Sequence, residues 1–550
     1  MSEKLSPIEP IKINSDGLRG TLKESLQDAH TGTIRPDDEA LIKFHGMYVQ
    51  DDRDRRAERA EKKLDKLFSF MIRLRLPGGV LTADQWLATH DISEKYGTGT
   101  IKITTRQTVQ LHGLLKHELR PMIQSFVQSK LDSIAACGDV NRNVTCSAHP
   151  QASPLHTQIH AYADRISTLL LPKTQSYYEI WVDDEKIYER SAEVDPLYQD
   201  RYLPRKFKIG IAVPPDNDVD IFTNDLGLIA IIKNNELQGF NLAVGGGLST
   251  THGNPNHYAR LATEIGFIPL DDEKIMKAVY EVVTIQRDFG NRSDRKLSRL
   301  KYTIDKMGVE NFKAELEKRI GFQLEEKRDY TFNRRSDHFG WEKNHEGKYF
   351  YTLFVENGVI KPYQKQFLFA VATQQWAEFR FTCNQNLILS QISEENKPKV
   401  QELIEKYDIE KHDSVLRRNS MACVALPTCP LALAEAQRYL PELITKIEPL
   451  VAKYGLSGDE LIIRMTGCPN GCGRPYVAEI GFVGTGPEQY NLMLGGDRLG
   501  FRLNQIYKKQ LTENEILVEV EQLLIAYKKE ASIGETFGDF TFRKYINIQG

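Results

Sequence analysis

Four of the seven cysteines in this 550-residue chain form two close pairs near its C-terminal end. Cys423 and Cys429 lie in CVALPTC, and Cys468 and Cys472 lie in CPNGC. Thiolates that converge in a folded chain can bind a metal ion or an iron–sulfur cluster. We therefore expect a metal centre at these four residues.

The spacing of the pairs, Cys-x5-Cys-x38-Cys-x3-Cys, indicates which centre this is. Structural zinc sites usually have short gaps of two to four residues within each pair. The gap of five, beside Pro427 and Pro430, fits that pattern poorly. Four cysteine thiolates are the usual ligands of a [4Fe–4S] cluster, and no C-x-x-C-H or C-x-x-C sequence indicates c-type haem or a thioredoxin-like site. The spacing favours an iron–sulfur cluster, with zinc as the alternative.

Composition and charge exclude several classes of protein. The net charge of -3 provides no global basic field for nucleic acid. No apolar run approaches the roughly 20 residues that span a bilayer, and the N-terminal MSEKLSPIEPIKINSDG lacks the hydrophobic region of a signal peptide. We expect a cytoplasmic protein that binds neither nucleic acid nor membrane. In that compartment thiols stay reduced, so clustered cysteines indicate metal or redox chemistry.

The elements that must position the cysteines occur twice. Four segments of the first half resemble four segments of the second half, in the same order. The pairs are IKITTRQTVQL (101–111) with FRFTCNQNLIL (379–389), NRNVTCSAHP (141–150) with NSMACVALPT (419–428), KIGIAVPPDND (208–218) with IIRMTGCPNGC (462–472), and GFNLAVGGGLS (239–249) with QYNLMLGGDRLG (489–500). The first pair alternates apolar and polar residues, as half-buried strands do. We predict a pseudo-twofold molecule of α+β and α/β units.

The repeat predicts a metal centre in one half only. Cys146 lies within one residue of the position that matches the first ligand, but Pro214 and Asp218 occupy the positions of the last two ligands. A second cluster of the same kind therefore cannot form. We interpret Cys137, Cys146 and Cys383 as small buried hydrophobic residues.

The repeat also predicts the division of the chain into five parts. The segment DDRDRRAERAEKKLDKLF (51–68) is dense in both charges, which predicts a solvated helix with i,i+4 ion pairs. The predicted parts are an N-terminal arm and charged helix (1–65), a first small unit (66–135), a first large unit without a cluster (136–337), a second small unit (338–410) and a second large unit with the cluster (411–550).

These residues resemble the sirohaem-dependent sulfite and nitrite reductases. The resemblance rests on the cysteine quartet, the TGCPNGCGR loop and the T-x-R-Q-T strand, and it covers nearly the whole chain after about residue 40. It extends through LIKFHGMYVQDDRDRRAERAEKK, RLPGGVLT, YLPRKFKIG, NLAVGGGLS and NSMACVALPTCPLALAEA. The HGMY-x-QDDRD stretch indicates the sulfite branch. The implied fold has two ferredoxin-like half-domains and two larger sirohaem and Fe–S domains.

The resemblance implies two cofactors, a [4Fe–4S] cluster and a sirohaem that share one thiolate. Cys472 matches the bridging ligand, and the other three cysteines match the remaining cluster ligands. The family holds sirohaem with the strand IKITTRQTVQLH, in which even spacing would place polar side chains on one face. Without the resemblance, such a face is read as solvated. The implied sirohaem ligands are Lys102, Thr104, Arg106, Gln110 and His112, with Lys102 in place of an expected arginine.

A cationic cluster for the substrate is also implied by the family. Arg73 in RLRLPGG, Arg142 in NRNV, and Lys206 and Lys208 in PRKFK match its anion-binding residues. They would bind sulfite and stabilise charge on its oxygens, and the lysines and bound water would supply protons. Arginine is a poor proton donor. Read alone, RKFK is typical of a solvated strand edge.

The implied activity is the six-electron reduction of sulfite to sulfide, in assimilatory sulfate reduction and cysteine biosynthesis. No stretch of the chain has a Rossmann fingerprint, so electrons must come from outside. The family implies an NADPH-oxidising flavoprotein (α) subunit and hence a hetero-oligomer, and ferredoxin is the alternative donor. The alternative functions are reduction of nitrite to ammonia at the same cofactors, and a zinc-stabilised binding module without enzymatic activity.

Overall fold

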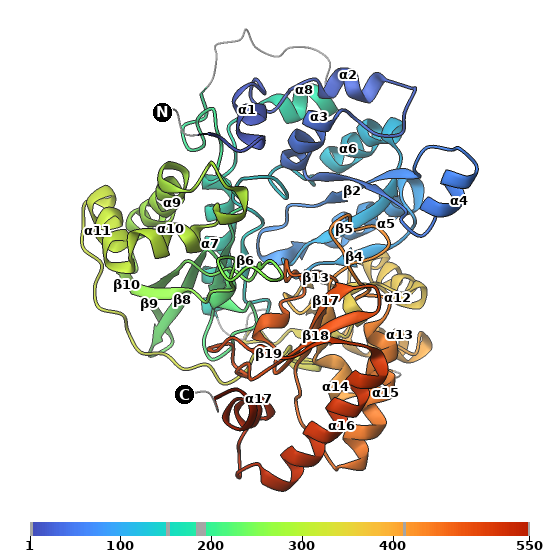
Figure 1. The fold of residues 1–550 in the computed structure, drawn as a ribbon, viewed down its shortest axis with the longest axis vertical. Coiled ribbons are helices and arrows are strands. Elements are labelled where there is room, and N and C mark those ends of the chain that lie inside the picture. Colours follow the sequence, from blue (N-terminus) through green and yellow to red (C-terminus); the bar gives the residue numbers. More distant parts are fainter. Residues whose placement is uncertain (1–3, 150–153, 183–193, 411–413, 548–550) are drawn as a thin grey trace.

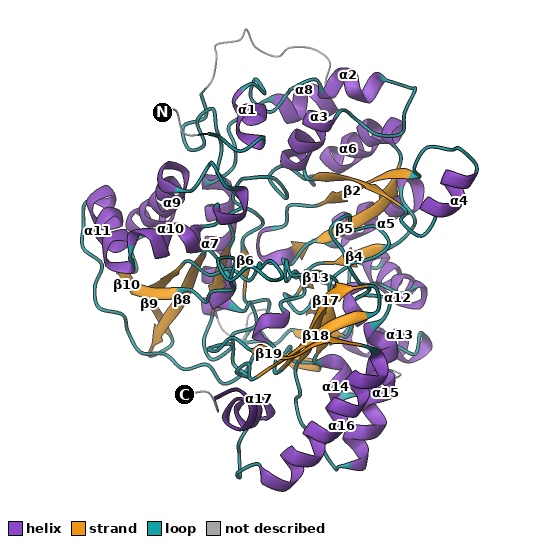
Figure 2. Ribbon diagram, viewed as in Figure 1, coloured by secondary structure: helices purple, strands orange, loops and turns teal. Residues whose placement is uncertain are grey.

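The fold consists of four β-sheets with helices packed around them, in two pairs that follow the sequence repeat (Figure 1). The computed structural model describes residues 4–149, 154–182, 194–410 and 414–547. Figure 2 shows the sheets near the middle of the molecule and most of the long helices at its periphery. The predicted pseudo-twofold architecture is confirmed by the strand orders of these sheets.

The two small sheets have the same antiparallel strand order. The first runs β1-β2-β5-β4 and the second runs β11-β12-β14-β13. Their bounds are β1 Met47–Asp51, β2 Phe68–Arg73, β4 Ile101–Ile103, β5 Val109–Leu114, β11 Gly340–Lys343, β12 Tyr349–Leu353, β13 Glu378–Phe381 and β14 Leu387–Ile392. Because β1 pairs with β2, the first small sheet begins at Met47, before the predicted boundary at residue 66.

The segment 101–112 is a hairpin, so the prediction of a single strand is wrong. Strand β4 ends at Ile103, Gln107 adopts a left-handed backbone conformation (φ 52°), and β5 begins at Val109. The repeat segment turns in the same way at Gln385 (φ 69°). Alternation predicted the strands correctly, but it does not reveal a tight turn within a polar run.

The two small units exchange backbone contacts across the pseudo-twofold axis. Strand β3, Val80–Leu81, joins the second sheet by pairing with β13, where Val80 faces Arg380. Val359 of the second unit forms a bridge with Lys102 of β4 in the same manner. Helices α5 (Ala83–Tyr96) and α12 (Pro362–Thr373) follow these two contacts and pack against each other.

The two large sheets also share one topology, in which two parallel pairings are followed by two antiparallel ones. The orders are β6-β7-β8-β9-β10 and β15-β16-β17-β18-β19. Their bounds are β6 Thr145–Cys146, β7 Ile209–Ala212, β8 Leu226–Lys233, β9 Glu236–Val244, β10 Thr263–Pro269, β15 Ser420–Ala422, β16 Ile463–Thr466, β17 Ile480–Gly486, β18 Gln489–Leu494 and β19 Gln505–Leu511.

The helices enclose a large hydrophobic core. One continuous core includes both small units and the first large unit, and the second large unit has a separate core. The remaining helices are α1 Ile8–Ile13, α2 Leu22–Gln27, α3 Pro36–Leu41, α4 Arg56–Glu61, α6 Leu119–Gln128, α7 Pro154–Leu169, α8 Ser176–Trp181, α9 Asp272–Phe289, α10 Leu300–Met307, α11 Val309–Ile320, α13 Lys397–Lys406, α14 Val415–Arg418, α15 Leu440–Lys453, α16 Glu513–Glu530 and α17 Phe537–Thr541.

The charged segment after β1 forms the short helix α4, which projects from the molecule (Figure 1). It contains the expected i,i+4 ion pair, between Glu58 and Lys62 at 2.7 Å, and no residue of α4 is buried. The prediction of a solvated helix is confirmed, although the helix is shorter than the charged run. None of the helices in the described ranges has the length and apolar character needed to cross a bilayer.

Candidate functional site

Neighbouring parallel strands bring the two cysteine loops together. Cys423 follows the last residue of β15, and Cys468 follows the end of β16 by two residues. Because β15 and β16 are parallel and adjacent, both loops leave the same edge of the sheet. The Cys423 Sγ accepts a hydrogen bond from the Gly467 backbone N–H at 3.4 Å and lies 3.4 Å from Thr466 Oγ1. The structure therefore joins cysteine pairs that are 38 residues apart in sequence.

The four thiols share one electrostatic environment. Burial and, after it, the neighbouring Cys472 thiolate raise the pKa of Cys468 to about 12 and of Cys429 to about 11. The pKa of Cys423 is raised by the same two causes. Each of these three cysteines thus senses the charge of Cys472. A positively charged metal centre would favour ionisation of all four cysteines together.

The arrangement fits a cluster better than a single zinc ion. Four thiolates around zinc, at about 2.3 Å from the metal, would bring their sulfur atoms to within about 3.8 Å of one another. Among the described residues, the one set of three ligand atoms gathered within 4.8 Å contains no cysteine. Wider spacing of the sulfur atoms suits a larger [4Fe–4S] cube.

The first half has a hydrogen bond where the second half has two ligands. Counted from the ends of the matching strands, Ser147 corresponds to Cys423 and Asp218 corresponds to Cys472. Ser147 Oγ donates a hydrogen bond to Asp218 Oδ1 at 2.7 Å. Cys146 is one residue from the matching position, as predicted, and lies buried in β6. The first half thus closes the matching loops without a cluster.

Three residues that the sequence did not single out hold the cysteine loops. Arg53, in the HGMY-x-QDDRD stretch, donates to the carbonyl oxygens of Cys429 (3.1 Å) and Ala432 (2.8 Å). Thr105 Oγ1 donates to the Cys472 carbonyl at 3.3 Å. Thr250 donates its backbone N–H to the Pro469 carbonyl at 2.9 Å. Spacing in the sequence could not have identified these residues, because each belongs to a different segment of the chain.

Three of the predicted residues form one row across the first small sheet. In the strand register, Arg73 of β2 faces Gln110 of β5, and Gln110 faces Lys102 of β4. With its amide turned to suit its neighbours, Gln110 accepts hydrogen bonds from Arg73. The Lys102 ammonium donates to the Asn357 carbonyl at 2.9 Å and also contacts Gln437. Burial lowers the pKa of Lys102 to about 7, and its contacts with Asn357 and Gln437 link the two halves.

The other predicted cofactor ligands differ in how well their polar groups are paired. Arg106 donates to Asn224 Oδ1 (2.5 Å) and to the Ile209 carbonyl (2.8 Å), but its Nε has no partner among the described residues. His112 Nδ1 lies 3.0 Å from Gln50 Oε1, and its buried Nε2 is likewise unpaired within the described ranges. Thr104 Oγ1 accepts the Arg106 backbone N–H at 3.1 Å. Unpaired buried nitrogens of this kind suit an acidic macrocycle.

The four predicted anion-binding residues come together. Arg73 and Arg142 both donate to the Ala136 carbonyl, at 3.4 and 3.3 Å. The extended stretch that carries Lys206 and Lys208 lies beside Arg142, whose backbone N–H donates to the Phe207 carbonyl at 2.9 Å. The two lysines lie on the same side of this stretch, as alternate residues of extended chain do.

The lysines face cations and a thiolate rather than a carboxylate. Burial and the nearby Arg205 lower the pKa of Lys206 to about 7, whereas the Cys472 thiolate raises it. Burial and Lys206 lower the pKa of Lys208. No acceptor binds either ammonium within the part of the chain that the structure describes. Basic side chains gathered beside the cysteine loop would favour a bound anion, which would in turn favour the charged form of the lysines.

Comparison with known proteins assigns the class. Residues 62–128 and 342–407 match the nitrite/sulfite reductase ferredoxin-like half domain, and residues 161–324 match the nitrite and sulphite reductase 4Fe-4S domain. The chain belongs to the nitrite and sulfite reductase family, as predicted. The 161–324 match contains no cysteine, so it covers the half in which the ligands are absent.

Curated relatives carry one name. The chain is 56% identical to the "Sulfite reductase [NADPH] hemoprotein beta-component" of Leptospira biflexa, over 98% of this chain and 99% of that protein. It is 50% identical to the protein of that name from Lysinibacillus sphaericus and 49% identical to that from Staphylococcus haemolyticus. These two matches cover 98% and 99% of this chain, respectively, and 96% of each relative.

A solved structure of the Mycobacterium tuberculosis NirA protein has the same fold. The TM-score is 0.79 at 23% sequence identity, over 98% of this chain and 97% of the other. Together with the family matches to both half domains, this confirms the predicted fold class.

Proposed function

We propose that this chain is the haemoprotein component of an NADPH-dependent sulfite reductase, which reduces sulfite to sulfide with six electrons. The reaction belongs to assimilatory sulfate reduction and supplies sulfide for cysteine biosynthesis. The relatives at 49–56% identity support sulfite over the alternative, nitrite. The observation that carries the proposal is that the half-buried lysine pair lies beside the cysteine loop, where the charge of Cys472 acts against the lowering of both lysine pKa values.

The cofactors in this proposal are a [4Fe–4S] cluster and sirohaem. Cys423, Cys429 and Cys468 would bind the cluster, and Cys472 would bind the cluster and sirohaem together. When bound, the pair supplies electrons one after another and an iron atom at which sulfite can be held. The unpaired Nε of Arg106 would donate to a sirohaem carboxylate, and Nε2 of His112 would do so once the bound carboxylate favours the protonated ring.

The protein's own residues bind the anion and deliver protons. Arg73 and Arg142, fixed by the Ala136 carbonyl, would orient the sulfite oxygens. Each S–O bond that breaks needs protons so that oxygen can leave as water. Lys206 has a pKa of about 7, so it can give up a proton near neutral pH and regain one from solvent.

Electrons would come from a partner. We propose an NADPH-oxidising flavoprotein (α) subunit as the donor, in a cytoplasmic hetero-oligomer; the names of the relatives support NADPH as the source. The alternative donor is ferredoxin. If NADPH and purified flavoprotein fail to support turnover while reduced ferredoxin succeeds, the flavoprotein is not the partner.

The function is tested with protein made in cells that have iron and synthesise sirohaem. We expect a haem-like absorption spectrum, iron in place of zinc, and turnover of sulfite with reduced methyl viologen. The comparison is nitrite turnover with the same donor. Negligible sulfite turnover beside rapid nitrite turnover would identify a nitrite reductase, and zinc without iron would end the redox proposal.

A further inference from the structure

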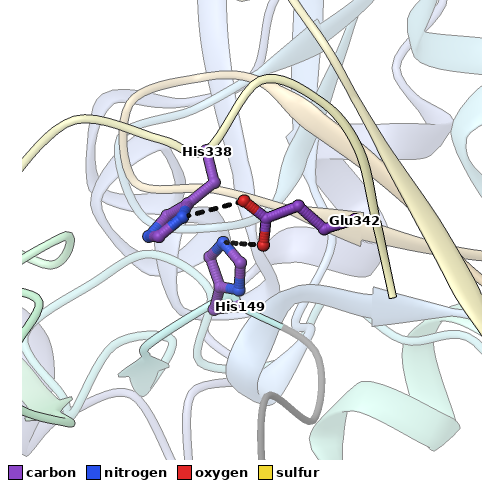
Figure 3. Close-up of side chains that lie close together, drawn as sticks. All are labelled: His149, His338 and Glu342. Carbon is purple, nitrogen blue, oxygen red and sulfur yellow. Dashed lines mark hydrogen bonds and ion pairs between the residues drawn. The ribbon is translucent and has the colours of Figure 1, made fainter. Parts of the chain in front are cut away.

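A cluster of histidine and carboxylate side chains lies outside the cysteine site. Figure 3 shows the Glu342 carboxylate beside the two histidine rings, with one oxygen toward His338 and the other toward His149. His338 Nδ1 is 3.2 Å from Glu342 Oε1, and His149 Nε2 is 4.0 Å from Glu342 Oε2. Ligand atoms of all three residues lie within 4.8 Å of one another. We propose that His149, His338 and Glu342 form a second metal site, which binds Zn²⁺.

His149 offers a nitrogen that the protein does not use. The residue is 8% exposed, and its Nε2 has no hydrogen-bond partner among the described residues. Its ring lies against Phe350 and His338, with centroid distances of 5.1 and 3.7 Å. A neutral imidazole with an unpaired buried nitrogen is the form that binds metal.

His338 has the second partner that metal-binding histidines usually have. Its Nε2 lies 2.9 Å from Asp216 Oδ2, so the ring can donate this N–H to the carboxylate. The hydrogen bond fixes the ring and leaves Nδ1 3.2 Å from Glu342 Oε1, where a metal ion could bind between the two atoms in place of a proton on Nδ1. Carboxylate–histidine–metal triads of this kind hold many zinc ions.

Two residues of this cluster, His149 and Asp216, lie on the first-half counterparts of the cysteine loops. His149 follows β6 by three residues, and Asp216 follows β7 by four, whereas the matching loops after β15 and β16 carry Cys423 and Cys468. One loop pair thus presents thiolates for a cluster. The first-half loops contribute one ligand, His149, and the outer partner Asp216. The other two ligands, His338 and Glu342, come from the start of the second small unit, and three such ligands plus water suit zinc.

One cation competes for the site. Arg334 Nη1 lies 2.6 Å from His338 Nδ1 and donates to the nitrogen that a metal ion would need. Glu342 and Asp216 contribute two negative charges against this single guanidinium, so a divalent ion can displace it. Removal of Arg334 should therefore strengthen metal binding, which is a result that a purely structural histidine cluster does not predict.

The test measures zinc in the cofactor-loaded protein, so that the cysteines are already in use. After treatment with a chelator, the protein is dialysed against micromolar free Zn²⁺, and zinc per chain is determined by mass spectrometry. We expect one zinc ion with nitrogen and oxygen ligands in X-ray absorption spectra. Glu342→Gln and His149→Ala should weaken binding about a hundredfold or more, since loss of even an outer partner costs roughly 10- to 100-fold.

Two controls keep the proposal falsifiable. His117→Ala, at an exposed histidine of another segment, should leave zinc binding unchanged, and Arg334→Gln should tighten it. Glu342→Gln keeps the size of a partly exposed side chain, so it reports on the ligand even if His149→Ala fails to fold. Absence of zinc, sulfur ligation of the zinc, or equal binding by Glu342→Gln and the parent protein would overturn the proposal.

Discussion

At the scale of single residues, Cys472 differs from the other three cysteines because it is exposed in the folded chain. Cys472→Ser should remove the thiolate that joins the proposed cofactors while keeping nearly the same side-chain volume. We expect sirohaem absorbance and iron per chain to fall to about a tenth or less. Cys146→Ser makes the same change at a buried thiol of the first half and should keep both cofactors. Full cofactor content in the Cys472 variant would remove it from the ligand set.

Lys208 is the second residue whose role can be isolated. Its ammonium group lies near Lys206 and the Cys472 thiolate, where charge acts on a bound anion. Lys208→Ala should keep the cofactor spectrum and lower kcat/KM for sulfite by about 10² to 10³, the usual effect of losing one such group. Lys233→Ala, at an exposed lysine that ends β8, should change neither value. Unchanged sulfite kinetics in the Lys208 variant would exclude it from the site.

At the scale of elements, periodicity predicted the strands around the site but not how they turn. The even spacing of Lys102 and Gln110 placed both on one face, and they do share a face, but they do so as partners in a hairpin. The convergence of Arg73, Arg142 and Lys206 could not be derived from spacing, because contacts between distant segments depend on tertiary packing. The resemblance to a known family supplied that information.

The exchanged contacts between the small units depend on two glycines with the same geometry. Gly79 and Gly358 both have φ near +74°, and a Cβ at Gly358 would lie 2.3 Å from the Ile103 carbonyl of the other unit. Gly358→Ala should lower the free energy of unfolding by about 3 kcal/mol or more, because backbone blocks the added methyl group. Chemical denaturation measures this change.

The matched control separates backbone strain from the steric clash. Gly347 has φ +79°, but a Cβ there would meet only the end of Lys343, at 3.8 Å. Gly347→Ala should therefore lower the free energy of unfolding by about 1 kcal/mol, because only the left-handed conformation is unfavourable for the new residue. Equal losses of unfolding free energy in Gly358→Ala and Gly347→Ala would show that the backbone contact exchanged between the small units does not stabilise the molecule.

At the scale of the whole molecule, the duplication leaves two equivalent positions in contact at its centre. Asp220 and Arg474 each lie eight residues beyond the matching strands β7 and β16, and each has a left-handed backbone (φ 47° and 56°). They form an ion pair with each other at 2.7 Å. Equivalent positions of the two halves thus carry residues of opposite charge that pair with each other. The matching loops differ in the same way, with Cys423 in one half and Ser147 in the other.

Asp220 is 2% exposed and contacts three buried arginines, which are Arg335, Arg464 and Arg474. Burial alone would raise the pKa of its carboxyl group, but the arginines outweigh burial and hold it below its ordinary value. The carboxylate therefore stabilises the fold at every pH above about 4, its value in the unfolded chain, and this contribution is lost as pH falls further.

Asp220→Asn should consequently leave buried guanidinium charges uncompensated in both halves at once. We expect the free energy of unfolding at neutral pH to fall by about 3 to 5 kcal/mol, as when one partner of a buried ion pair is removed. Asp305→Asn, which removes the carboxylate 2.9 Å from Arg260 in a partly exposed pair, should cost about 1 kcal/mol or less. Denaturant titrations at several pH values measure the free energy of unfolding of both variants. The difference between Asp220→Asn and the parent protein should narrow below about pH 4. A loss no greater than that of Asp305→Asn would mean that the central ion pairs do not hold the two halves together.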